Sequence, residues 1–266
     1  HCTDTACTGA TTSTIDSAGN VGSYTSVAIG ADGLGLVSYY DTTNGDLKVA
    51  HCTDTACTGA TTSTIDSAGD VGQYTSITVD DVLVRALISY YDTTNGDLKV
   101  AVCGDTACTS AAYWTPFDSA GDVGQYTSIT MGADGLGLVS YLDYTNSAVK
   151  VARCMDYFCN SATKSTIASA WTPGDTSITI GADGLVLVAY NFYQSHSLKV
   201  THCWKSDCSN GATTSTIDSA GHVGQYTSIT LGADGLGLVS YYDVTNGDLK
   251  VAHLSSAAGT PYVRRR

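Results

Sequence analysis

The feature that most constrains this chain is that its sequence repeats itself five times. Residues His51–Thr64 copy His1–Thr14 without a change. A short apolar-Lys-Val motif recurs along the chain, and its lysines lie 51, 51, 49 and 51 residues apart, at Lys48, Lys99, Lys150, Lys199 and Lys250. Repeats of about 40–50 residues without long helical patterns are typical of propeller blades. The sequence therefore predicts an array of five similar units.

Each unit contains four short runs that are rich in β-branched and aromatic residues, which predict β-strands. In the first complete unit these runs are 24–29, 34–40, 47–52 and 61–66. An Ala-Asp-Gly turn joins the first two runs, and the pair Asn44-Gly45 joins the next two. Both are signals of tight hairpins, because they supply residues that tolerate a positive φ. We therefore expect every unit to be a four-stranded antiparallel meander.

The two ends of the sequence complement each other. Residues 11–16 read as a fourth strand without the preceding three, and the last unit ends after its third strand. Pairing these ends would close a ring and remove exposed sheet edges. We predict an all-β fold, a single five-bladed β-propeller over 1–253 that the N-terminal strand closes, with an open solenoid as the alternative. The expected blades are 24–66, 74–117, 125–168, 176–218 and 226–253 with 11–16, and 254–266 form a tail.

The 10 cysteines fall into five pairs with the same Cys-x4-Cys spacing. Each pair lies between the third and fourth predicted strands of a unit, where a turn would bring the two sulfurs together. Zinc binding is the alternative, but the histidine before Cys52 is replaced by Val102 and Arg153 in later units. We predict disulfides, and hence an extracellular or cell-surface location, with the pairs Cys2–Cys7, Cys52–Cys57, Cys103–Cys108, Cys154–Cys159 and Cys203–Cys208.

Composition excludes several classes of function. A net charge of −13 with 12 lysines and arginines argues against nucleic-acid binding, and no apolar run is long enough to span a membrane. All 25 acidic residues are aspartates. The glutamate that five-bladed furanosidases and related hydrolases use as general acid is therefore missing. Since the polar residues also repeat rather than form one unique constellation, we predict that the protein is not an enzyme and has no catalytic residues.

One predicted face of the ring carries a repeated set of polar and aromatic side chains. Carboxylates, amides and tyrosine rings suit a shallow sugar site, and the same oxygens could gather around Ca2+, with no other cofactor expected. Turn formation alone also explains the Asn-Gly-Asp segments. The candidate ligand-binding residues are Tyr24, Asp41, Asn44, Asp46, Tyr74, Asp92, Asn95, Asp97, Tyr226, Asp243, Asn246 and Asp248.

The fourth unit departs from this pattern. It has Phe192, Ser195, His196 and Ser197 where the other units carry the polar set, and its connector is shortened to 171–174. If every blade held one site, the fourth blade would be expected to lack it.

Residues 38–52, 89–103 and 240–253 resemble bacterial extracellular propeller repeats of the form SYYDxTNGDLKVAHC. The architecture is more loosely similar to the five-bladed tachylectin-type lectins, although none of their sugar-contacting residues can be matched here. Such repeats suit multivalent binding, in which weak single sites combine. We predict a secreted or cell-surface, non-enzymatic module that binds glycans or other cell-surface polymers. The alternative is a self-associating structural subunit of an extracellular layer or filament.

Overall fold

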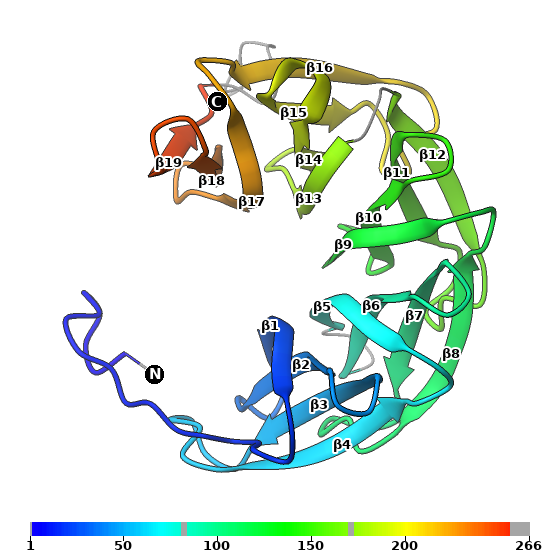
Figure 1. Ribbon diagram of the computed structural model, residues 1–266, viewed down its shortest axis with the longest axis vertical. Helices are drawn as coiled ribbons and strands as arrows, with labels where there is room; N and C mark the ends of the chain where they lie inside the picture. The colour runs from blue at the N-terminus through cyan, green and yellow to red at the C-terminus, as the bar shows by residue number, and fades with distance from the viewer. Residues whose placement is uncertain (1, 81–83, 170–172, 256–266) are drawn as a thin grey trace.

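The chain folds into a five-bladed β-propeller, which confirms the predicted fold class (Figure 1). The structure is a computed structural model and describes residues 2–80, 84–169 and 173–255. Within these residues the strands form five antiparallel sheets, and the first strand of each sheet lies nearest the central axis. The fourth strands of the first four blades lie at the outer rim. The 3.6-residue periodicity of helices is missing from the sequence, so strand pairing supplies nearly all of the regular structure.

The strand boundaries follow the predicted runs closely. Blade 1 comprises β1 (Val21–Ile29), β2 (Gly35–Asp41), β3 (Asp46–Cys52) and β4 (Ala60–Asp66). Blade 2 comprises β5 (Val71–Asp80), β6 (Arg85–Asp92), β7 (Asp97–Cys103) and β8 (Ala111–Asp118). Blade 3 comprises β9 (Val123–Met131), β10 (Gly137–Asp143), β11 (Ala148–Cys154) and β12 (Ala162–Ser169). Blade 4 comprises β13 (Pro173–Ile180), β14 (Val186–Phe192), the 3-10 turn η1 (Tyr193–Ser195), β15 (Ser197–Cys203) and β16 (Ala212–Asp218). Blade 5 comprises β17 (Val223–Leu231), β18 (Gly237–Asp243) and β19 (Asp248–His253).

Neighbouring blades pack face to face through apolar side chains. Between blades 2 and 3, Leu98 and Val100 of β7 are buried in one cluster with Val123 and Ile129 of β9. Gly124 begins the inner strand of blade 3 so close to β7 that a Cβ atom there would meet Leu98 Cα at 2.6 Å. The burial of such side chains is the main source of stability, at about 1.5–3 kcal/mol for each leucine or valine. The core of this protein therefore lies between the blades.

A second link between blades is polar and recurs around the ring. The strands β4, β8 and β16 each end in an aspartate that accepts hydrogen bonds from a tyrosine and a lysine of the next blade. Asp118, for example, accepts from Tyr141 and Lys150, at 2.7 and 3.0 Å. Burial alone would raise the pKa of Asp118, but these hydrogen bonds and one from Lys164 lower it to about 2. This stabilisation is present above the ordinary aspartate pKa and is lost as the pH falls towards 2.

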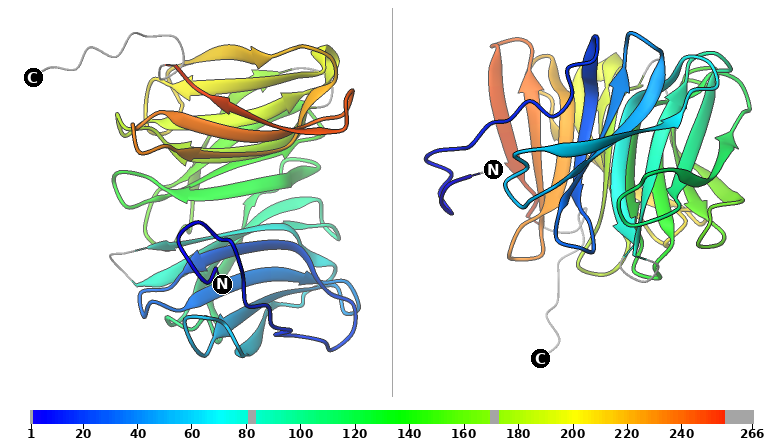
Figure 2. Two further views of the ribbon diagram at one scale, coloured as in Figure 1. Left: turned by 90° about the vertical axis from the view of Figure 1, so that its left-hand side faces the viewer. Right: turned by 90° about the horizontal axis from the view of Figure 1, so that it is seen from below.

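The predicted closure of the ring is not what the structure shows. The last sheet contains only β17, β18 and β19, and within the described residues 11–16 form no strand. Instead Asp16 accepts hydrogen bonds from Tyr39 and Lys48, each at 2.6 Å, in the position that Asp118 occupies for blade 3. The N-terminal segment thus keeps its contacts with blade 1 without reaching β19. Figure 2 (left) looks onto the resulting opening, with β19 above and the N-terminal segment below.

We call this opening the seam, which is bounded by β1 and 11–16 on one side and by β17 and β19 on the other. Side chains that are buried elsewhere in the ring are open at the seam. Leu249 of β19 is 80% exposed, whereas its counterpart Leu98 is 0% exposed. On the opposite side Gly22 has nothing within 4 Å of its Cβ position, although its counterpart Gly124 contacts Leu98. The two sides of the seam are thus complementary in sequence but apart in space.

Two equivalent glycines test this description of the seam. Gly72 and Gly22 both have a positive φ, of 104° and 92°, so alanine is strained at either position by about 1–2 kcal/mol. Only at Gly72 would the added Cβ also meet Leu47 Cα, at 2.7 Å. We expect Gly72→Ala to lower the free energy of unfolding by about 1–3 kcal/mol more than Gly22→Ala does. Urea denaturation of both variants measures the difference, and equal losses would contradict the open seam.

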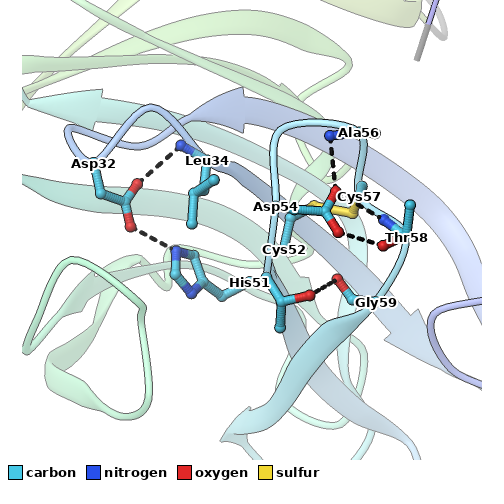
Figure 3. Close-up of a disulfide and its surroundings, with 10 residues drawn as sticks. Asp32, Leu34, His51, Cys52, Asp54, Ala56, Cys57, Thr58 and Gly59 are labelled. Atoms are coloured by element: carbon cyan, nitrogen blue, oxygen red, sulfur yellow. Dashed lines mark hydrogen bonds and ion pairs between the residues drawn. A yellow bond between two sulfur atoms is a disulfide. The ribbon is translucent and has the colours of Figure 1, made fainter.

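All five predicted disulfides are present, which confirms the reading of the cysteine pairs as Cys2–Cys7, Cys52–Cys57, Cys103–Cys108, Cys154–Cys159 and Cys203–Cys208. Each joins the end of a third strand to the loop that follows, except that the first lies in the N-terminal segment. Figure 3 shows the Cys52–Cys57 bond with Asp54, whose carboxylate accepts from Ala56 N at 2.9 Å and closes the turn. The Ala-Asp-Gly hairpin lies beside it, since His51 Nε2 is 2.8 Å from Asp32. The disulfide loops and these hairpins therefore share one face of the ring.

Candidate functional site

The opposite face of the ring has a mouth lined by two consecutive residues from each inner strand, of which the second is always a threonine and the first varies. Four of the five first residues are tyrosines, Tyr24, Tyr74, Tyr126 and Tyr226, and blade 4 contributes Asp175. Each tyrosine has a φ of 51–54°, at a bulge where the inner strand shifts register against its neighbour. Adjacent rings contact one another, with centroids 4.6 Å apart for the first two tyrosines and 4.4 Å apart for the second and third. The mouth is therefore an aromatic rim that one carboxyl group interrupts.

A pocket of about 440 Å³ opens off this mouth between blades 3, 4 and 5. Its walls come from the inner strands, from the ends of the second strands β10 and β14, and from the residues that follow these two strands. The residues that matter for its chemistry are Tyr126, Leu142, Asp175, Asn191, Tyr193 and Tyr226. A pocket of this volume is in the range that small-molecule sites occupy in proteins.

The pocket exists because two side chains at one repeat position are smaller than the others. In blades 1 and 2 this position holds Tyr40 and Tyr91, whose rings lie 6.1 and 6.3 Å from the nearest tyrosine of the mouth. Blades 3 and 4 have Leu142 and Asn191 instead. Asn191 is buried and donates to the Val223 carbonyl oxygen at 2.7 Å, away from the mouth. The space that two phenol rings would fill is left open.

Asp175 is the acidic group of this pocket. Its carboxylate accepts a hydrogen bond from the Tyr226 backbone N–H across the junction between blades 4 and 5. Burial raises the pKa of Asp175 above its ordinary value, and this outweighs the hydrogen bond, which acts in the opposite direction. Within the described residues no lysine, arginine or histidine forms an ion pair with it. A carboxyl group in such surroundings keeps its proton at a higher pH than a solvated aspartate does.

The structure separates the predicted ligand-binding residues into two groups. Tyr24, Tyr74 and Tyr226 lie at the mouth. The aspartates lie at the facing ends of the second and third strands and the asparagines in the turns between them. Buried Asp41, for example, ends β2 and accepts from Asn44 N and Nδ2 at 3.1 and 2.9 Å. The same bonds recur from Asn95 to Asp92 and from Asn246 to Asp243, and the other predicted residues, Asp46, Asp97 and Asp248, begin the third strands. The carboxylates thus serve their own turns, and their role as ligand contacts stays a prediction.

Neither a metal cluster nor a membrane helix is found in the part of the chain that the structure describes. No group of three or more histidine, cysteine or aspartate side chains there is arranged to hold a metal ion. No helix there is long and apolar enough to cross a membrane.

Sequence reasoning missed two residues that are central to the pocket, Asp175 and Asn191. Asp175 stands at the repeat position where the other units have the tyrosine of a Tyr-Thr-Ser motif, and Asn191 stands where three units have tyrosine. Both signals are visible when the repeats are aligned. The expectation that blade 4 lacks a site rested on its loops alone. The residue that distinguishes blade 4 at the mouth, Asp175, lies in its inner strand β13.

The comparisons with known proteins agree on the fold. No protein-family model and no curated protein matches the sequence. Among solved structures, a protein of unknown function from Dyadobacter fermentans is similar with a TM-score of 0.62 and 13% identity, over 86% of this chain and 74% of that one. An α-L-arabinofuranosidase from Lactobacillus brevis has a TM-score of 0.53 and 10% identity, over 87% and 90%. An exo-β-1,3-galactanase from Phanerochaete chrysosporium with galactose has a TM-score of 0.56 and 11% identity, over 96% and 70%.

These matches contradict the prediction of a non-enzymatic glycan-binding module, and that of a structural subunit as its alternative. Several of the structurally similar proteins are glycoside hydrolases, so this fold is one that enzymes use. The prediction went wrong because it treated all polar residues as repeated and the lack of glutamate as decisive. Asp175 is a single, unrepeated carboxyl group at the mouth. At these low identities the likeness establishes the fold alone.

Proposed function

We propose that the protein is an extracellular glycoside hydrolase that binds a saccharide in the pocket between blades 3, 4 and 5. The observation that carries this proposal is Asp175, a carboxyl group at the mouth beside the aromatic side chains of Tyr126 and Tyr226, where burial raises its pKa above the ordinary value. Aromatic faces stack on sugar rings, and Gln125 and Gln225 add amides that can hydrogen-bond to hydroxyls. The hydrolases with a similar fold support the reaction class, and the five disulfides support an extracellular location.

The chemistry that follows assigns one role to Asp175. Its carboxyl proton passes to the glycosidic oxygen as the bond between that oxygen and the anomeric carbon breaks. Water then adds to the anomeric carbon, and the proton it loses restores the carboxyl group, so that one water is consumed for each bond cleaved. Glycosidases commonly use two carboxyl groups, but Asp175 is the carboxyl group among the described residues that line this pocket. We therefore expect slow turnover, since Asp175 must both donate the proton and later accept one, with no second carboxylate in this lining to activate the water.

The charge of the protein narrows the substrate class. The net charge of −13 creates a negative potential that repels polyanionic chains. A pocket lined by tyrosine and amide side chains, with no cation among its described lining residues, suits neutral sugars. We infer that the substrate is a neutral glycan rather than a uronate polymer or a sulfated polysaccharide.

Asp175→Asn tests this function. General acid catalysis contributes roughly 10²–10⁴-fold to a rate, so we expect the release of reducing ends from a panel of neutral polysaccharides to fall by about that factor. The wild-type rate should decline as the pH rises through the pKa of Asp175, because only the protonated carboxyl group donates. Stability at neutral pH should not fall, since asparagine places no charge in a site that disfavours one.

A matched control is Asp134→Asn, because Asp134 lies in the Ala-Asp-Gly hairpin of blade 3 on the opposite face and pairs with Arg153. This variant should keep the full rate. The proposal is wrong if wild-type protein cleaves none of the neutral polysaccharides, or if the Asp175 variant cleaves them as fast as the Asp134 variant.

A further inference from the structure

Two histidines pack against each other at the junction of blades 4 and 5. The imidazole centroids of His196 and His222 are 4.2 Å apart, and the ring planes are inclined by 53°. Tyr193 of η1 lies against both, with centroids at 5.3 and 5.6 Å. Tyr193 also lines the pocket that contains Asp175. The pair is therefore placed beside the pocket, on the same face of the ring.

These two histidines differ from the other described histidines in what they contact. His51, His202 and His253 each place Nε2 within 2.9 Å of an aspartate in the hairpin of their own blade. In the described part of the chain, neither His196 nor His222 forms an ion pair with an aspartate. The side-chain nitrogen of Gln225 lies 3.4 Å from His222 Nε2. Neither imidazole is thus held by a carboxylate, and at His222 Nε2 a metal ion would compete only with this long hydrogen bond from Gln225.

The pair is also specific to this junction. His196 occupies a left-handed position, with a φ of 49°, where three other units have glycine and one has serine. His222 occupies a position where the other units with a full connector have asparagine or aspartate. Asp70 at this position accepts from the Tyr40 hydroxyl at 2.7 Å, and the residue that corresponds to Tyr40 in blade 4 is Asn191. At this junction the hydrogen bond between a tyrosine hydroxyl and an aspartate is therefore replaced by a contact between two imidazole rings.

From this juxtaposition we propose that His196 and His222 form a binding site for a divalent transition-metal ion such as Cu2+, Ni2+ or Zn2+. Neutral imidazole nitrogens suit these ions, whereas Ca2+ and Mg2+ prefer oxygen ligands. Because both imidazoles belong to loops at one junction, a shared ion would also link blades 4 and 5 next to Tyr193. The remaining coordination positions are filled by water, so the site is of the open kind. This inference does not depend on the proposed hydrolase activity.

Titration with CuSO4, followed by calorimetry and electron paramagnetic resonance, tests the site. The variants His196→Gly and His222→Asn restore residues that other units carry, so both should fold with an unchanged melting temperature. Wild-type protein is expected to bind one Cu2+ with a spectrum split by two imidazole nitrogens. Each variant should lose this splitting and bind Cu2+ at least tenfold more weakly.

His51→Gln is the matched control, because His51 pairs with Asp32 on the opposite face. It should retain the two-nitrogen spectrum and the wild-type affinity. The proposal is overturned if wild-type protein shows no two-nitrogen Cu2+ signal, or if that signal survives in both His196→Gly and His222→Asn. Since no glycan or catalytic rate enters the measurement, its failure would leave the proposed function untouched.

Discussion

Replacing Leu98 by alanine is expected to lower the free energy of unfolding by about 2–5 kcal/mol, whereas the same change at Leu249 should lower it by less than about 0.5 kcal/mol. The two leucines occupy the same position of the repeat, in β7 and β19. Leu98 is 0% exposed and is covered by the inner strand of blade 3, while Leu249 is 80% exposed at the seam. Large-to-small changes are costly only where they leave a cavity. Urea denaturation of both variants, analysed with a common slope, measures the two losses.

A third variant, Leu47→Ala, serves as the control, since Leu47 of β3 is also fully buried and should behave as Leu98 does. The opposite outcome has a definite meaning. If Leu249→Ala costs as much as Leu98→Ala, then Leu249 is covered in solution and the ring closes as the sequence predicted. Residues 11–16 would in that case lie beside β19 and complete the last blade.

Replacing Lys99 by methionine should destabilise the protein by about 3–5 kcal/mol, because it leaves the buried carboxylate of Asp66 without its cation. The side chains of Lys99 and Asp66 are only 4% and 2% exposed, and the ammonium also lies 3.5 Å from Asp92. Burial by itself would raise the pKa of Asp66, but hydrogen bonds from Lys99, Ala68 N and Tyr90 hold it below its usual value. Methionine keeps much of the stem of the side chain and removes the charge.

Lys250 offers the matched comparison. It pairs with Asp218 in the same way in blade 5, but its side chain is 33% exposed beside the seam. Solvent there screens the charge that is left behind, so Lys250→Met should cost far less than Lys99→Met. Both losses are read from urea denaturation at neutral pH. Equal losses for the two lysines would show that burial does not set the strength of this repeated ion pair. In the wild type this stabilisation is present above the ordinary aspartate pKa and disappears as the pH falls through the lowered pKa of Asp66.

Much of the fold could be predicted because it depends on features that every repeat shares. The period near fifty residues, the Asn-Gly hairpins and the Cys-x4-Cys spacing are local signals, and they correctly gave the blades, the turns and the disulfides. The closure could not be predicted from the sequence alone. Residues 11–16 are suited both to pair with β19 and to present Asp16 to Tyr39 and Lys48, and the structure satisfies only the second of these requirements.

The site was hidden for the opposite reason, because it depends on what one repeat lacks. Asp175 and Asn191 replace tyrosines, and the pocket appears where these rings are missing. A reading that searches for recurring polar residues selects the loop aspartates, whose oxygens the turns already use. In a repeat protein of this kind, candidate catalytic residues are best sought first in the unit whose sequence departs from the others.

The left-handed backbone of the mouth tyrosines has a wider consequence for how such a ring could acquire new activities. Tyr24, Tyr74, Tyr126 and Tyr226 each sit at a bulge with φ of 51–54°, and in these four blades the tyrosine side chain lines the mouth. Besides glycine, the residues that tolerate this conformation best are asparagine, aspartate and histidine, which are also the residues that supply acids, bases and metal ligands. Single codon changes at these points would therefore place reactive groups around a common centre while leaving the apolar clusters between the blades unaltered.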